Sequence, residues 1–158
     1  MGTATATPTE VSAFYAALAQ EILQHYPRGP VTIAVTGPDA DVTRRVADAF
    51  GEAVVASDRA VVRASGRGDE PDATRGEIAA FRSGGGDVLV VDGPQLLRPA
   101  LRGSWNASVW LEGGPALSGT ALESERAYVR DGDPRGAASA VLNVADPDLP
   151  TRVFSDSC

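Results

Sequence analysis

Apolar residues follow two different periods along this chain, and segments of the two kinds alternate. Short continuous apolar runs predict buried strands, at residues 31–36, 53–57, 87–92, 107–111 and 140–144. Apolar residues at helical spacing predict helices, at residues 8–25, 39–50, 72–83, 94–101 and 115–128. Strands that alternate with helices are typical of an α/β fold. We therefore expect a three-layer sandwich with a mostly parallel five-stranded sheet.

The length and composition of the chain are those of one globular domain. It has 158 residues, of which 43% are hydrophobic and 22% charged, and a chain of this size buries about two-thirds of its unfolded surface. We expect residues 1–158 to form a single domain. No apolar run is long enough to cross a membrane, and the first residues lack the basic start and apolar core of a signal peptide. A cytoplasmic location is therefore expected.

Charge and the rarer residue types exclude several function classes. The formal net charge of −7 argues against a nucleic acid or an anionic membrane as partner, because both are polyanions. Every basic residue is an arginine, so a P-loop lysine, a Schiff-base lysine and a lysine general base are absent. With one histidine, His25, and one cysteine, Cys158, the chain offers no disulfide, no zinc cluster and no Ser-His-Asp triad. We expect no metal site.

The segment from residue 31 to residue 50 has the frame of a nucleotide site without its chemistry. A strand, a turn at Gly37 and a helix form the frame of the phosphate-binding P-loop, G-x-x-x-x-G-K-[ST]. Gly37 fits the first glycine. Val42, Thr43 and Arg44 then replace the second glycine, the lysine and the hydroxyl residue that holds magnesium.

The loop over residues 66–71 is polar and rich in glycine. It contains the adhesion-type tripeptide Arg67-Gly68-Asp69. In an acidic chain that we expect to be cytoplasmic, we interpret this tripeptide as incidental.

A longer segment, residues 88–111, resembles the Walker B region of the uridine kinase-like P-loop kinases. The family pattern, roughly DG-x-x-L-x-R-P-E-L-x-x-x-W-D-x-x-V-x-L, is matched at Asp92-Gly93, Leu96 or Leu97, Arg98-Pro99, Leu101, Trp105-Asn106, Val109 and Leu111. Downstream, Tyr128, Asp133-Pro134, Ala138, Val141, Asn143 and Asp146-Pro147 resemble the closing segment of that family in the same order. The resemblance implies a P-loop kinase-like core over residues 29–153, preceded by the helix at 8–25.

The departures from the family pattern all concern phosphate and substrate. Without the second glycine, the lysine and the magnesium-holding hydroxyl, the charge that develops in phosphoryl transfer has no partner. The resemblance makes Asp39 less of a departure, since an acid is common there in the family, whereas Asp41 adds negative charge where phosphate would lie. The acidic substrate segment of the family is reduced to Ser57-Asp58-Arg59, and its arginine-bearing lid to Arg126 and Arg130. We therefore expect no ATP or magnesium cofactor.

The carboxyl ends of the strands are where open α/β sheets bind ligands, and this rule gives a predicted site. We expect Asp58 and Asp92 to face one crevice as acid and base. The predicted ligand- and anion-binding residues are Gly37, Thr43, Arg44, Arg45, Arg59 and Arg126. Two plainer alternatives stay open: Asp92 caps the turn that follows it, and Asp58 is a solvated loop residue.

Three functions are compatible with these residues. The first is a kinase-derived protein that has lost phosphoryl transfer and binds a small molecule in the former nucleotide crevice, as a repurposed enzyme or as a binding protein. The second is a non-catalytic pseudokinase that contacts a protein partner or a second copy of itself, with Trp105 as a candidate contact residue. The third is an active nucleoside kinase with an unusual phosphate site.

Overall fold

The computed structural model of the chain, which describes residues 8–154, is organised around a six-stranded sheet. The strand order is β2-β3-β1-β4-β5-β6, and every pair is parallel except β5 with β6. The strands are β1 (Val31–Thr36), β2 (Val61–Ser65), β3 (Val88–Gly93), β4 (Ala107–Glu112), β5 (Ala140–Asn143) and β6 (Thr151–Val153).

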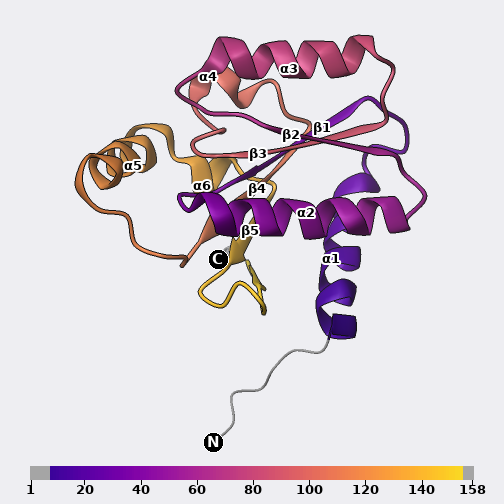
Figure 1. The fold of residues 1–158 in the computed structure, drawn as a ribbon, viewed down its shortest axis with the longest axis horizontal. Helices are drawn as coiled ribbons and strands as arrows, with labels where there is room; N and C mark the ends of the chain where they lie inside the picture. Colours follow the sequence, from indigo (N-terminus) through magenta and orange to yellow (C-terminus); the bar gives the residue numbers. More distant parts are fainter. Residues whose placement is uncertain (1–7, 155–158) are drawn as a thin grey trace, which may run out of the picture.

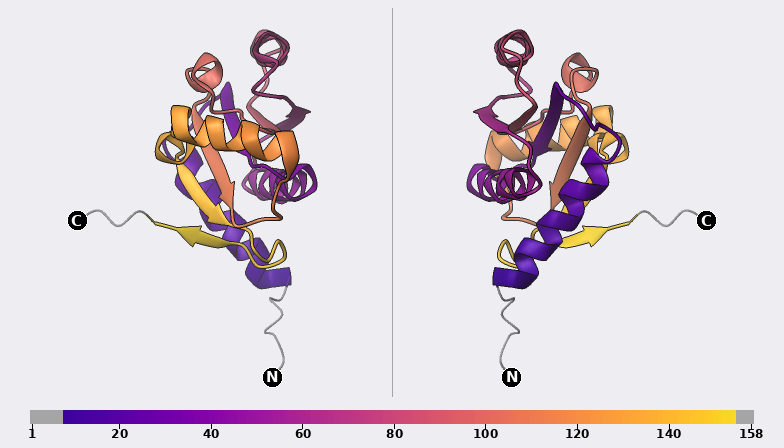
Figure 2. Two further views of the ribbon diagram at one scale, coloured as in Figure 1. Left: turned by 90° about the vertical axis from the view of Figure 1, so that its left-hand side faces the viewer. Right: turned by 90° about the vertical axis from the view of Figure 1, so that its right-hand side faces the viewer.

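Helices cover both faces of this sheet (Figure 1). They are α1 (Pro8–Leu23), α2 (Ala40–Ala56), α3 (Pro71–Ser83), α4 (Pro99–Arg102), α5 (Gly119–Gly132) and α6 (Pro134–Ala137). The helices α1 and α2 lie together under one face, with α1 towards β5 and β6, while α3 and α4 lie on the other face (Figure 2). The predicted α/β sandwich with a mostly parallel sheet is confirmed.

The central strands are apolar at nearly every position because both of their faces are covered. Each residue of β1 and of β3 is buried. Side chains at alternate positions of β1 pack towards different helices: Ile33 belongs to the core that contains Phe50 of α2, and Ala34 to the core that contains Phe81 of α3. Continuous apolar runs therefore identified these strands correctly.

The second predicted strand was wrong. Residues 53–57 continue α2 as far as Ala56, and β2 lies later, at Val61–Ser65. The helix continues through Gly51, which is buried beside β2; a Cβ built there would be in ordinary contact with Arg63 at 3.4 Å and Val61 at 3.6 Å. Since Val54 is fully buried, the apolar run at 53–57 is one face of a helix. A single glycine therefore did not end the helix here.

One further segment differs from the sequence-based expectation. The sheet has six strands and not five, because β6 pairs antiparallel with β5 at its edge. Trp105, a candidate partner contact, is half-buried against the core, and its indole Nε1 donates to the Leu96 carbonyl at 2.8 Å. Trp105 thus packs against the chain's own core with part of its surface. In the described part of the chain, none of the helices has the length and apolar character needed to cross a membrane.

Substitution of Phe50, which is fully buried in the core between α2 and the sheet, tests this packing. Phe50→Ala should lower the free energy of unfolding by about 3–5 kcal/mol, because it removes a large side chain and leaves a cavity. Val55→Ala on the same helix, where the side chain is 57% exposed, should change it by less than about 0.5 kcal/mol. Urea denaturation measures both. Equal effects would contradict the position of α2.

Candidate functional site

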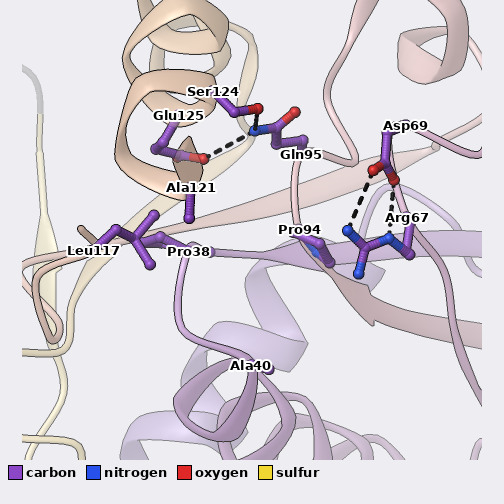
Figure 3. Close-up of a pocket in the computed structure, with 11 residues that line it drawn as sticks. Pro38, Ala40, Arg67, Asp69, Pro94, Gln95, Leu117, Ala121, Ser124 and Glu125 are labelled. Atoms are coloured by element: carbon purple, nitrogen blue, oxygen red, sulfur yellow. Dashed lines mark hydrogen bonds and ion pairs between the residues drawn. The ribbon is translucent and has the colours of Figure 1, made fainter. Parts of the chain in front are cut away.

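A cavity of about 270 Å³ opens at the carboxyl ends of the parallel strands. This is the edge at which open α/β sheets bind their ligands. The turns after β1 and β3, the loop after β2 and helix α5 all contribute to it (Figure 3). Its lining residues are Gly37, Pro38, Ala40, Arg67, Asp69, Pro94, Gln95, Leu117, Ala121, Ser124 and Glu125.

The turn from β1 into α2 is short. The helix α2 begins at Ala40, so only Gly37, Pro38 and Asp39 connect the strand to the helix. A P-loop pattern over residues 37–44 needs a loop of backbone N–H groups that wraps phosphate oxygens. In this chain the second half of that segment, from Ala40 onwards, is helical.

The amino end of α2 is satisfied by the side chain of Asp39. The Asp39 carboxylate accepts the Val42 N–H at 2.9 Å, and the Asp39 carbonyl accepts the Thr43 N–H at 3.0 Å. The Thr43 hydroxyl donates to the same carbonyl at 2.6 Å, and Thr43 is 1% exposed. Helix amino ends attract anions, and here an internal carboxylate holds that position as an N-cap.

Of the predicted anion-binding residues, Gly37 alone lines the cavity. Arg44 and Arg45 lie on α2 with side chains that are 60% and 55% exposed, where Arg44 lies 3.9 Å from Asp41 and Arg45 pairs with Asp148. Arg126 is exposed on α5 and lies outside the cavity lining. The structure thus places these arginines around the outside of the crevice.

Asp92 is a buried carboxylate near the end of β3. It is 6% exposed, and it accepts from the Arg63 guanidinium at 2.8 Å and from the Ser65 hydroxyl at 3.1 Å, both on the neighbouring strand β2. Arg63 also donates to the Val90 carbonyl at 2.7 Å. The side chain of Asp92 therefore ties β3 to β2.

Asp58 and Arg59 lie at the other end of the strands, beside their amino ends. Both precede β2, and Asp58 is exposed at the end of α2 with a φ of 67°. Arg59 makes two hydrogen bonds of 2.7 Å to Asp87, which precedes β3. That pairing lowers the pKa of Asp87, chiefly through the hydrogen bonds. The shared Asp58–Asp92 crevice is therefore not formed, because the strand predicted to bring Asp58 there is a helix.

Polar residues that sequence reasoning missed meet beside α5. Gln95 takes a left-handed φ of 55° in the turn after β3. Its amide nitrogen donates to Ser124 Oγ at 3.1 Å and to Glu125 Oε2 at 3.4 Å, while its amide oxygen accepts from Arg98 Nε at 2.7 Å. Burial raises the pKa of Glu125, against opposing effects of the Gln95 hydrogen bond and the Arg98 charge.

The tripeptide Arg67-Gly68-Asp69, which the sequence suggested to be incidental, forms another wall of the cavity. The Arg67 guanidinium donates to both Asp69 oxygens, at 2.9 and 3.2 Å. These hydrogen bonds are the largest effect that lowers the pKa of Asp69. Gly68 packs so closely on Gln95 that a Cβ would lie 1.7 Å from the Gln95 carbonyl oxygen. Had the sequence analysis placed β2 at residues 61–65, it would have predicted this loop at the carboxyl ends of the strands.

Metal ligands do not gather in the part of the chain that the structure describes: residues 8–154 contain no group of three or more His, Cys, Asp or Glu arranged to hold an ion. The polar groups of the cavity are an arginine–aspartate pair, an amide, a hydroxyl and one further carboxylate. Such groups can bind a small polar molecule through hydrogen bonds and charge.

Two solved structures are similar to this chain. A possible uridine kinase from Bacillus stearothermophilus superposes with a TM-score of 0.65 at 11% identity, over 84% of this chain and 98% of the other. The chain has the fold of the P-loop kinases. A proposed fructose transport system kinase from Silicibacter sp. TM1040 gives a TM-score of 0.47 at 14% identity, over 78% and 91% of the two chains. No family model and no curated protein matches the sequence.

The fold confirms what the resemblance in residues 29–153 implied about architecture, and it says nothing about activity. At 11% identity, the superposition relates the backbones and not the site residues. The function must be argued from the cavity and from the turn after β1.

The structural assignment of Asp92 can be tested against Asp48, since both carboxylates pair with Arg63. Asp92→Ala should cost about 3 kcal/mol of unfolding free energy, because it leaves a half-buried guanidinium without its buried partner. The side chain of Asp48 is 59% exposed, so Asp48→Ala should lower the unfolding free energy by less than about 1 kcal/mol. Chemical denaturation gives both values. An Asp92→Ala protein as stable as the parent would show that the carboxylate is not structural.

Proposed function

We propose that this protein binds a small molecule in the cavity at the carboxyl ends of β1, β2 and β3, and that it does not carry out ATP-dependent phosphoryl transfer. The proposal combines a P-loop kinase fold with a turn that offers phosphate no cradle. It concerns binding, and it assigns no reaction, because the predicted acid and base lie at different edges of the sheet.

The turn after β1 carries the loss of phosphoryl transfer: Val42, Thr43 and Arg44 stand in place of the glycine, the lysine and the magnesium-holding hydroxyl residue, and Asp39 caps the helix. In a kinase of this superfamily the P-loop amides and a lysine hold the β- and γ-phosphates. Here the Val42 amide is bonded to the Asp39 carboxylate, and the Thr43 hydroxyl points back to the helix backbone. A phosphate at this position would face a carboxylate in place of free N–H donors, which is unfavourable by charge and by hydrogen bonding.

The composition of the cavity supports the binding of a small ligand. Ligand sites combine apolar walls with a few convergent polar groups, and this cavity has both. Pro38, Pro94 and Leu117 supply apolar surface, while Gln95 and Glu125 supply hydrogen-bonding groups. Its volume of about 270 Å³ is at the small end for ligand pockets, which favours a compact metabolite.

A thermal-shift screen tests the proposal. ATP with magnesium and sugar phosphates should leave the melting temperature unchanged, whereas at least one unphosphorylated metabolite should raise it. A ligand at 100 times its Kd stabilises by about 2.7 kcal/mol, or a rise of roughly 5–10 °C.

The variants Ala121→Trp and Glu123→Trp show where such a ligand binds. Both positions are exposed on α5, but Ala121 lines the cavity and Glu123 does not. The shift should disappear in Ala121→Trp and persist in Glu123→Trp. A saturable shift with ATP and magnesium, or a metabolite shift that survives Ala121→Trp, would refute the proposal.

A further inference from the structure

The lining of the cavity contains two carboxylates and one cation. Three ionisable side chains line it: Arg67, Asp69 and Glu125. Arg67 and Asp69 neutralise each other through two hydrogen bonds. Glu125 is the remaining carboxylate of the lining, in a chain whose formal net charge is already −7. The charge of Arg98, which lies outside the lining, acts on it from nearby.

Glu125 has a hydrogen-bond donor but no ion pair. Its Oε2 accepts from Gln95 at 3.4 Å, a long bond, and among residues 8–154 no arginine nitrogen lies within 4.0 Å of its carboxylate. The nearby Arg98 donates instead to the amide oxygen of Gln95. The carboxylate of Glu125 thus lies beside the cavity without a cation that touches it.

The surroundings of Glu125 make a cation the favoured partner. The side chain is half-buried, and burial raises its pKa because the charged form has lost water. A cation that enters the cavity restores the stability of the charged form, and the hydrogen bonds it donates are of the strong, charge-assisted kind. Because Asp69 is already paired with Arg67, an anion would meet the carboxylate of Glu125 and, at the neighbouring turn, that of the capping Asp39.

The remaining walls fit the body of such a ligand. Pro38, Pro94, Leu117 and Ala121 line the cavity with apolar atoms, and Figure 3 places Leu117 and Pro38 beside one another, with Ala121 and Glu125 above them on α5. A flat apolar group can pack on these side chains while a cationic group at its end reaches the carboxylate.

We infer that the cavity takes a compact ligand with an apolar body and one cationic nitrogen group, an amine or amidine, which pairs with the Glu125 carboxylate. This inference rests on the proposed small-molecule function and names its ligand class. Gln95 positions the carboxylate through its amide nitrogen, and the Arg67–Asp69 pair closes the opposite wall.

Three probes of nearly identical shape separate charge from size: benzamidine is cationic, benzamide is neutral and benzoate is anionic. Titration of the ¹⁵N-labelled full-length protein, followed by amide chemical shifts of Gln95, Ala121 and Glu125, gives the Kd of each probe. Benzamidine should bind about tenfold more tightly than benzamide, the weight of one charge-assisted contact, and benzoate should bind most weakly.

Variants at two glutamates of α5 assign the preference to one side chain. Glu125→Gln keeps the shape and should bring the Kd values of benzamidine and benzamide within about twofold of each other. Glu125→Lys should favour benzoate. Glu123→Gln, at an exposed position outside the cavity lining, loses the same charge from the same helix and should leave the preference intact. Unchanged circular dichroism shows that each variant is folded.

The other outcomes would overturn the ligand class, the site, or the proposed function itself. Equal affinity for the three probes, or a preference for benzamidine that survives in Glu125→Gln, removes the cationic ligand class while leaving a small-molecule cavity. Shifts confined to amides away from the cavity remove this site for the cation. If none of the probes binds but a neutral or anionic metabolite does in the thermal-shift screen, only the ligand class is wrong. If no compound binds in the thermal-shift screen or in the NMR titration, the proposed function is wrong as well.

Discussion

The Asp39 carboxylate bonded to the amino end of α2 is the interaction on which the rest of the site depends. By accepting the Val42 N–H at 2.9 Å, it lets the helix start at Ala40, directly after a three-residue turn. A helix capped in this way leaves fewer free backbone amides at its start, and this supports the proposed loss of phosphate binding at the turn. The same short turn brings Gly37, Pro38 and Ala40 to the wall of the cavity at the carboxyl ends of the strands.

Charged and polar side chains differ in their contacts between the amino and the carboxyl ends of the parallel strands. At the amino edge, Arg59 and Asp87 form a close ion pair that links the start of β2 to the start of β3. Within the sheet, Arg63 and Asp92 join the same two strands. At the carboxyl edge, Gln95 and Glu125 face the cavity from the turn after β3 and from α5. Some charged residues thus stabilise the fold, and others lie at the cavity.

The sequence predicted the fold better than the site, for identifiable reasons. The buried strands β1 and β3 are covered on both faces, which leaves a continuous apolar signal. The edge strand β2 has an arginine and only partly buried positions, so the apolar face of α2 at residues 53–57 gives the stronger strand signal. That single error moved Asp58 and Arg59 to the wrong edge and hid the loop at Arg67–Asp69. The part played by Gln95 depends on a left-handed turn and on contacts with residues about 30 positions away, which no local pattern records.

Backbone amide shifts of Val42 and Thr43 during titration with ATP and magnesium test the central claim most directly. These amides are bonded to Asp39, so we predict that neither shifts in a saturable way up to millimolar nucleotide. A saturable shift of both amides would mean that phosphate displaces the carboxylate at the amino end of α2. The cavity would then still be a nucleotide site, which would contradict the loss of phosphate binding at this turn.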